Sequence, residues 1–305
     1  MTGTPSKLAT LSLSQLEHWI THTKTQVQIG RLPNYIPLLA TADPQWLALQ
    51  VQTIEGNDYA VGDAAQPFAL MSVVKPFLLL FLLHQLGHEA VFARVGIDPS
   101  EQPFHSLAQL KSDQGFPRNP MINSGAIALT ALLPGQSGAE RCETLRRWLN
   151  QQSGAQLVLD APMLASVRSL NNEANRAIAT YLVQSGYLDS VETAIDTYNH
   201  ICCLSGTVGD LVRLGMLLAT SASPHSRTIN ALMLTCGLYE ASGRFAVRIG
   251  LPCKSGVSGA LLAVVPGAGA IACYSPTLDT TGNSIAGLYV VEQMARSLNL
   301  SVFSS

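Results

Sequence analysis

The stretch MSVVKPFLLLFLL, residues 71–83, decides how the chain folds, because it joins a short polar pattern to the longest apolar run in the sequence. Proline is tolerated in the first turn of a helix, where its missing N–H would have had no intrahelical partner. Pro76 therefore predicts a helix that starts close to Ser72. In that geometry Ser72 and Lys75, three residues apart, lie on one face and can touch.

A serine and a lysine at this spacing are suited to acyl transfer. A serine hydroxyl is a poor nucleophile until a base removes its proton, and a lysine is such a base only when burial or another cation lowers its pKa. The helix start also directs N–H groups at developing negative charge. Ser-x-x-Lys alone is common on solvated helices, but Lys254-Ser255-Gly256 strengthens it. Serine-acylating enzymes of the penicillin-binding type combine both elements, the second on a strand beside the nucleophile.

The segments on either side predict a sheet formed from both ends of the chain. Capping residues at 12–17 begin a helix, and residues 46–61 read as a hairpin around turn residues. A second hairpin is expected over residues 259–274, and an apolar stripe at helical spacing follows over residues 285–298. Between about residues 71 and 233 leucine, alanine and helical spacings dominate, so this part is expected to be mainly helical.

These elements together predict an α/β (α+β) fold, with an antiparallel sheet from both termini flanked by helices and an inserted helical lobe. No repeat, low-complexity linker or charge block marks a boundary, so residues 1–305 are expected to form one domain. Its sheet lobe would comprise about residues 1–70 and 235–305, and its helical lobe about residues 71–234.

Composition narrows the classes of function. Hydrophobic residues make up 47% and charged residues 12%, which favours a large interior and a surface partly covered by subunit contacts. A net charge of -2 without a basic run argues against nucleic acid as a partner. Residues 1–8 do not resemble a secretory signal, and the apolar run 77–83 is far below the roughly 20 residues that span a bilayer. A cytoplasmic protein with no membrane partner is expected.

The sequence offers two other candidate sites, a zinc site and a cysteine nucleophile. His84 and His88 have the spacing of a helical zinc pair, but the glutamate of His-Glu-x-x-His and a third ligand are missing, so no metal or cofactor is expected. Cys236 is a conceivable nucleophile without a histidine that is marked as its partner. The six cysteines show no CxxC spacing, and reduced, mostly buried thiols are expected.

Further motifs follow one another along nearly the whole chain. They read NYIP (34–37), PRNPMINSGAI (117–127), NRA (175–177), TCGLY (235–239), KSGV (254–257) and GNS (282–284). A block as long as residues 117–127 has little chance of arising as generic helix sequence. Together with Ser72 and Lys75, this ordered set resembles the serine-dependent glutaminase family, which has the β-lactamase-like fold.

The resemblance implies hydrolysis of the side-chain amide of L-glutamine to L-glutamate and ammonia through an acyl-serine intermediate. Ser72 would attack the amide, Lys75 would take its proton, and Lys254 would supply positive potential beside Lys75. Tyr239 would share proton transfer to the leaving ammonia and from the hydrolytic water. The backbone N–H groups of Ser72 and Val257 would form the oxyanion hole.

The resemblance also implies a homodimer or homotetramer as the assembly, and it implies which residues hold the α-amino and α-carboxylate groups of the substrate. The side chains of these residues are neutral, so they orient the substrate without a large desolvation penalty. They are Tyr35, Asn123, Asn175 and Tyr198, and Ser72, Tyr239 and Val257 complete the substrate-binding set.

One position departs from the family pattern. The family carries a glutamate that faces the substrate's ammonium shortly before the Asn-Arg element, and here Val167 stands in its place. The nearest acid is Glu173, but residues two apart on a helix do not share a face, so it is not expected to replace that glutamate beside Asn175. Loss of a charge-assisted contact costs about 1.5–3 kcal/mol.

Two alternative functions stay open at this level. One is another acyl-serine amidohydrolase, such as a β-lactamase-like peptidase, which the missing export signal disfavours. The other is a catalytically silent amino-acid-binding homologue. The joint presence of Ser72, Lys75, Tyr239 and Lys254 argues against the silent homologue, whereas Val167 leaves room for it.

Overall fold

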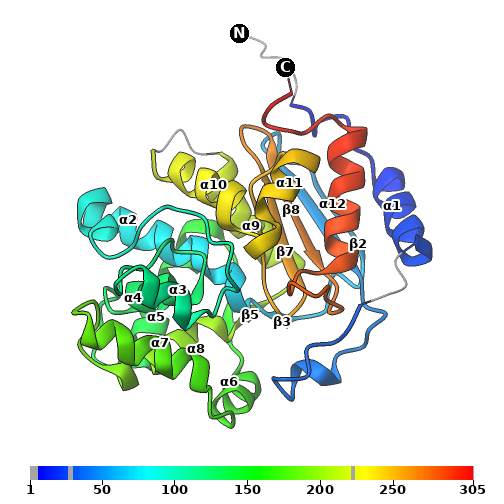
Figure 1. Cartoon of the computed structure of the whole chain (residues 1–305). Helices are drawn as coiled ribbons and strands as arrows, with labels where there is room; N and C mark the ends of the chain where they lie inside the picture. Colours follow the sequence, from blue (N-terminus) through cyan, green and yellow to red (C-terminus); the bar gives the residue numbers. More distant parts are fainter. Residues whose placement is uncertain (1–5, 27–29, 221–223, 305) are drawn as a thin grey trace.

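A five-stranded antiparallel sheet forms the middle layer of the protein. The computed structural model describes residues 6–26, 30–220 and 224–304 (Figure 1). The sheet has the order β2-β1-β8-β7-β6, so strands from both ends of the chain meet in it, as predicted. Its strands are β1 (Ala48–Thr53), β2 (Asp58–Gly62), β6 (Cys253–Ser255), β7 (Ala260–Val265) and β8 (Gly269–Tyr274).

Both hairpins predicted from sequence are present, and β1 pairs directly with β8. Both faces of the sheet are buried. Successive residues of a strand point to opposite faces, and accordingly Leu261 packs in the core under α1 (Leu13–Gln26) and α12 (Ile285–Ser297). Its neighbour Leu262 packs in the larger core on the other side, which α9 (Val208–Ala219) covers. This position places α9 between the sheet and the other helices (Figure 1).

Those other helices form the second part of the molecule. They are α2 (Lys75–Phe92), α3 (Leu107–Ser112), α4 (Asn123–Thr130), α5 (Gly138–Ser153), α6 (Ala161–Arg168), α7 (Glu173–Gln184), α8 (Val191–Cys202) and α10 (Pro224–Cys236). Helix α11 (Ser242–Arg248) instead packs through Phe245 on the core under α1 and α12. The segment Met71–Phe92 is long and apolar enough to cross a membrane, but 72% of its most apolar stretch is buried inside the fold. Core packing therefore accounts for its apolarity.

A second, three-stranded sheet has two of its strands within the part that was predicted to be mainly helical. Its order is β3-β5-β4, and its strands are β3 (Phe68–Ala69), β4 (Val158–Leu159) and β5 (Leu204–Gly206). Strands of two or three residues are too short to show a periodicity in the sequence. The sheet fixes the chain just before the apolar helix, because the Leu70 N–H donates to the Leu204 carbonyl at 2.7 Å.

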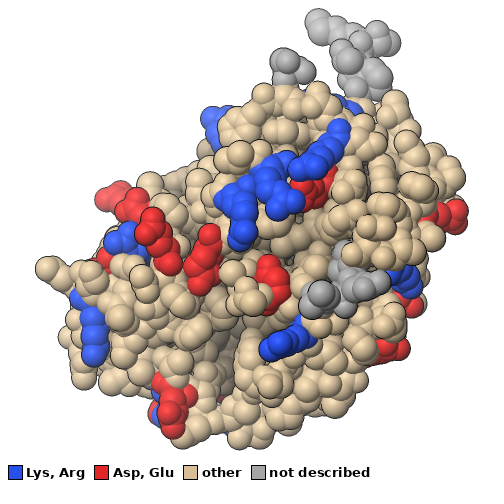
Figure 2. Space-filling model, turned by 45° about the vertical axis from the view of Figure 1, so that its right-hand side comes forward, with Lys and Arg blue, Asp and Glu red and all other residues tan. Residues whose placement is uncertain are grey.

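The surface reflects the low charge content. Most of the face in Figure 2 carries neither acidic nor basic side chains, and the charged groups lie apart from one another or in small clusters. All six cysteines are buried and none forms a disulfide, as predicted.

Candidate active site

Ser72 lies in a tight 3₁₀ turn, η2 (Met71–Val74), that runs directly into α2. Pro76 stands in the first turn of α2, so the predicted helix start is confirmed. Met71 has a φ of 48°, in the left-handed region that residues other than glycine rarely adopt. Such strain persists only where the surroundings impose it, and here it directly precedes the proposed nucleophile.

Lys75 is held by two acceptors in a fully buried position. Its Nζ donates to the Met121 carbonyl at 3.2 Å and to Asn123 Oδ1 at 2.8 Å. Burial lowers the pKa of Lys75 to about 7, because the charged amine is removed from water. A neutral amine has two N–H bonds and one lone pair. Since two acceptors take both hydrogens, the lone pair remains for a third partner, and Ser72 is one turn away.

Strand β6 carries a second buried amine to the same place. Lys254 Nζ donates to the Ser255 carbonyl at 2.6 Å and lies 4.5 Å from the centre of the Tyr239 ring. Burial, assisted by Lys75, holds the pKa of Lys254 well below its usual range. Lys254 therefore has fewer acceptors than Lys75, and burial disfavours the charge of both amines.

The contact between β6 and η2 is made at backbone level. A Cβ added to Gly256 would lie 2.6 Å from the Leu70 carbonyl oxygen, closer than such atoms approach in proteins. Only glycine therefore lets the strand that carries Lys254 approach the turn that carries Ser72 this closely.

Tyr239 completes the group around Ser72. Its hydroxyl donates to the Ser255 carbonyl at 3.2 Å and lies near the side chain of Ser72. Burial raises the pKa of Tyr239 to about 12, so near neutral pH this residue is an un-ionised phenol. Its φ of 56° places it, like Met71, in the left-handed region. Two residues with a strained backbone thus lie next to Ser72, Met71 in sequence and Tyr239 in space.

Asn123, the first residue of α4, links the two ends of the site. Its Oδ1 accepts from Lys75 Nζ at 2.8 Å and from the Tyr198 hydroxyl at 3.0 Å, and its Nδ2 donates to Asn175 Oδ1 at 2.8 Å. The sequence predicts a substrate-binding role for Asn123 but not its contact with Lys75. Its place in the long motif with Met121, the other acceptor of Lys75, was the available signal.

Among the described residues, two that line the pocket have a backbone N–H without a protein partner. Within the described residues, neither the Ser72 N–H nor the Val257 N–H donates to a protein acceptor. Both residues line the same pocket. Unpaired N–H groups at a nucleophile are suited to stabilise a developing oxyanion.

This inner pocket has a volume of about 120 Å³, and most of the predicted site residues line it. No acidic or basic side chain is part of its described lining, and Lys75, Lys254 and Tyr239 lie behind it. The residues that line it are Tyr35, Ile36, Met71, Ser72, Phe104, Asn123, Val167, Leu170, Asn172, Asn175, Tyr198, Asn199, Cys202 and Val257. Val167 thus faces the pocket, whereas Glu173 is exposed and its Oε1 accepts from Asn171 Nδ2 at 2.9 Å.

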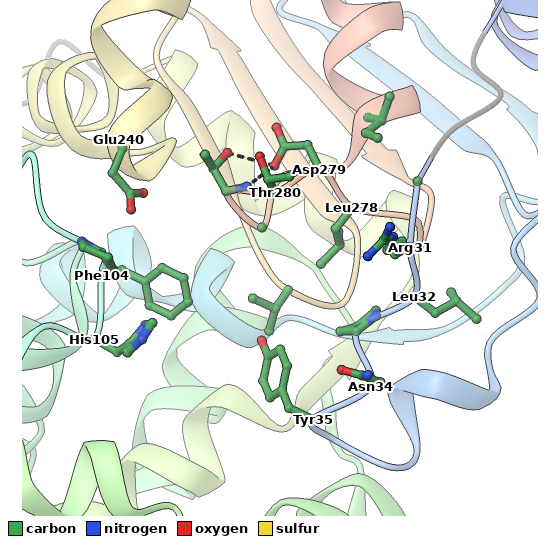
Figure 3. A pocket seen from close by; sticks show the side chains of 17 residues that line it. Arg31, Leu32, Asn34, Tyr35, Phe104, His105, Glu240, Leu278, Asp279 and Thr280 are labelled. Atoms are coloured by element: carbon green, nitrogen blue, oxygen red, sulfur yellow. Dashed lines mark hydrogen bonds between the residues drawn. The ribbon is translucent and has the colours of Figure 1, made fainter.

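A larger outer pocket of about 770 Å³ adjoins the inner one. Tyr35, Phe104 and Val257 line both. Figure 3 shows Tyr35 and Phe104 between Arg31 on one side and Glu240 on the other. The outer pocket therefore leads to the inner one past a neutral, largely aromatic wall.

The alternatives taken from residue spacing find little support in the structure. Gly87 breaks the regular helix with a φ of 78°, so His84 and His88 do not share a continuous helix face. Among the described residues no group of three or more His, Cys, Asp or Glu side chains is arranged to hold a metal ion. Burial raises the pKa of the Cys236 thiol, which makes it a weak nucleophile.

Comparisons with known proteins agree with one another. The family model described as Glutaminase matches residues 30–303. A glutaminase of Synechocystis sp. is 43% identical over 291 residues, which cover 93% of this chain and 89% of the relative. The solved structure of the probable glutaminase YbaS has a TM-score of 0.89 and 35% identity, and covers 97% of this chain and 100% of that one. A probable glutaminase from Bacillus subtilis, solved in complex with 6-diazo-5-oxo-L-norleucine, has a TM-score of 0.86 and 29% identity over 95% of this chain and 97% of that one.

Proposed function

The chain belongs to the glutaminase family, and from that premise we propose how its residues divide the hydrolysis of L-glutamine to L-glutamate and ammonia. The fold is β-lactamase-like, as the resemblance in sequence implied. The observation that carries the residue assignment is the buried pair of Ser72 and Lys75 at the start of α2, next to the inner pocket.

In the first step, neutral Lys75 takes the proton from Ser72 Oγ while this oxygen attacks the side-chain amide carbon. The amide oxygen becomes negatively charged and accepts from the N–H groups of Ser72 and Val257. Tyr239 passes a proton to the amide nitrogen, which leaves as ammonia, and regains one from Lys75. The glutamyl group is then bound as an ester to Ser72.

In the second step, water enters the place that ammonia has left. Tyr239 and Lys75 take a proton from the water as its oxygen attacks the ester carbon, and the same two N–H groups hold the oxyanion. The ester bond to Ser72 breaks, Oγ takes the proton back, and L-glutamate leaves. The order of proton transfers is the reverse of the first step, as expected when the leaving group and the nucleophile occupy one position.

We assign Lys254 a role different from the positive potential that the resemblance implied. Burial and Lys75 disfavour its charge, and it has one protein acceptor where Lys75 has two. When Lys254 is neutral, its amine stays beside the Tyr239 ring. Lys75 is then the one amine of the pair that takes up and releases a proton during the reaction. A charge on Lys75 opposes protonation of Lys254 for the same electrostatic reason.

Neutral groups are proposed to hold the α end of glutamine. Asn175, Tyr198 and Tyr35 line the inner pocket with side-chain oxygens and nitrogens that suit a carboxylate and an amine. Asn123 keeps both Tyr198 and Asn175 in place through its own amide. It therefore acts on the substrate side and on Lys75 at once.

The decisive experiment is ammonia release from L-glutamine by wild type and Ser72→Ala, with L-asparagine and a β-lactam as comparison substrates. Loss of the nucleophile is expected to lower kcat by roughly 10³-fold or more. Ser226→Ala is the matched control, because Ser226 is equally buried but lies on α10 outside the pocket. Equal rates in wild type and Ser72→Ala would contradict the assignment. Faster turnover of the β-lactam than of glutamine would favour the peptidase-like alternative.

We also propose that the protein works in the cytoplasm as a homodimer or homotetramer. In support, Val247 and Phe303 are exposed apolar side chains near the contact between the Val302 N–H and the Gly250 carbonyl. With 12% charged residues, little of the surface opposes association. No nucleic acid, membrane or cofactor enters this proposal.

A further inference from the structure

The inner pocket combines a site for an amino acid with a wall that carries no charge. Val167, near the end of α6, and Leu170, in the connection to α7, face the pocket with apolar side chains. The polar atoms beside them belong to Asn172, Asn175 and Asn199. A substrate ammonium at this wall would therefore meet amide oxygens and apolar surface.

Glu173 and the two acidic side chains of the neighbouring pocket are engaged elsewhere. Glu173 is exposed and accepts from Asn171. Glu192 pairs with Arg176, and Asp196 pairs with Arg168. None of these carboxylates lines the inner pocket. No acid in this part of the fold is free to turn inward without breaking a contact that the structure shows.

Charge matters here for selectivity as much as for affinity. A site with a buried carboxylate rejects a substrate that lacks the ammonium, because the carboxylate is left without a partner. A wall of valine, leucine and neutral amides leaves no charge unpaired when the ammonium is missing. It also gains little when the ammonium is present, since an amide oxygen is a weaker partner than a carboxylate.

Space continues beyond this wall. A neighbouring pocket of about 190 Å³ shares Leu170, Asn172 and Asn199 with the inner one. Its far side is formed by the two ion pairs, Arg168 with Asp196 and Arg176 with Glu192. A group attached to the α-nitrogen of glutamine could extend into this pocket without leaving a charge buried.

We propose that Val167 determines substrate range, so that γ-amides whose α-nitrogen is absent or acylated are hydrolysed about as well as L-glutamine. The inference rests on the proposed function, because the same Ser72 chemistry acts on all of these substrates. Val167 lies at the α end of the site, where the substrate is recognised rather than cleaved.

The first test compares kcat/KM of the wild-type protein for L-glutamine, for 4-carbamoylbutanoate, which lacks the amino group, and for N-acetyl-L-glutamine. The expected result is that all three values lie within about tenfold, since tenfold is the smallest preference that a charge-assisted contact would give. A preference for L-glutamine above tenfold over 4-carbamoylbutanoate would overturn the proposal. Poor turnover of N-acetyl-L-glutamine alone would overturn its extension to acylated substrates.

The second test introduces the missing charge. Val167→Glu is expected to raise the preference for L-glutamine over 4-carbamoylbutanoate by about tenfold or more, whereas Val167→Gln, equal in shape but neutral, changes it less than threefold. An equal effect of both variants would contradict a role of charge. If Val167→Glu does not fold, as judged by circular dichroism, the wild-type ratios decide. Unchanged rates in Ser72→Ala would disprove the nucleophile, while the ratios would still report on substrate range.

Discussion

The two ends of the inner pocket differ in how firmly the fold determines them. The nucleophile end is defined by Ser72, Lys75, Tyr239 and Lys254, and all four side chains are buried. The backbone of Tyr239 is strained, and Lys75 and Lys254 carry buried amines. At the α end, defined by Val167, Leu170 and Asn175, the wall is neutral and Asn175 is only half-buried. The chemistry of the reaction is therefore fixed by the core, and recognition of the substrate by a more exposed layer.

The origin of the two ends explains this difference. The nucleophile end forms where the start of α2 meets strand β6, two segments held by backbone contacts such as that of Gly256 with Leu70. The α end is formed by α6, α7 and the connection between them, where Leu170 and Asn175 are only partly buried. A change at the first end disturbs the core, whereas a change at the second alters the pocket wall.

The largest effect on catalysis is expected for Lys75→Met at the nucleophile end. This substitution keeps the length of the side chain but removes the base. A general base contributes roughly 10²–10⁴-fold, so kcat should fall within that range while KM changes little. Ammonia release under saturating glutamine measures it. Circular dichroism confirms that the variant is folded. A loss below tenfold would mean that another group accepts the Ser72 proton.

A smaller effect is expected in the pH dependence. Lys75 is a base only when neutral, and burial lowers its pKa to about 7, so kcat/KM should rise as pH increases through about 7 and then level off. Lys254→Met should leave this midpoint within about half a unit, because an amine that is already neutral exerts no charge on its neighbour. An upward shift of a unit or more would show that Lys254 carries charge and lowers the pKa of Lys75.

The smallest effect is expected for Glu173→Gln at the α end. Glu173 is exposed and lies outside the pocket lining, so KM for L-glutamine should stay within about twofold of the wild-type value. Steady-state kinetics measure it, and Asn171→Ala is a suitable control because it removes the side chain that contacts Glu173. A large rise in KM would show that this acid reaches the ammonium and that the two ends are less distinct than described.

Much of the nucleophile end could be predicted from the sequence. Pro76 marked the helix start, the apolar run predicted the burial that lowers the pKa of Lys75, and Lys254-Ser255-Gly256 predicted strand β6. Each of these depends on a few consecutive residues, and for that reason local patterns are enough. The hairpins that form the sheet were predictable for the same reason.

The remaining features depend on contacts between distant segments. The link from Asn123 to Lys75, Tyr198 and Asn175 joins four parts of the chain, and no spacing in the sequence records it. The strained backbone at Met71 follows from the small sheet that fixes Leu70, whose strands are too short to recognise. The roles of the individual residues stay predictions until the variants are measured.

The close approach of Gly256 to Leu70 has a consequence for laboratory evolution. Any side chain at residue 256 would push strand β6 away from the turn that holds the serine, so random mutagenesis there should yield mostly inactive clones. The segment from Leu170 to Asn172 offers the opposite prospect, because its side chains lie at the pocket wall and are partly buried or exposed. A combinatorial library confined to that segment would search for new amide specificities while the acylating machinery stays intact.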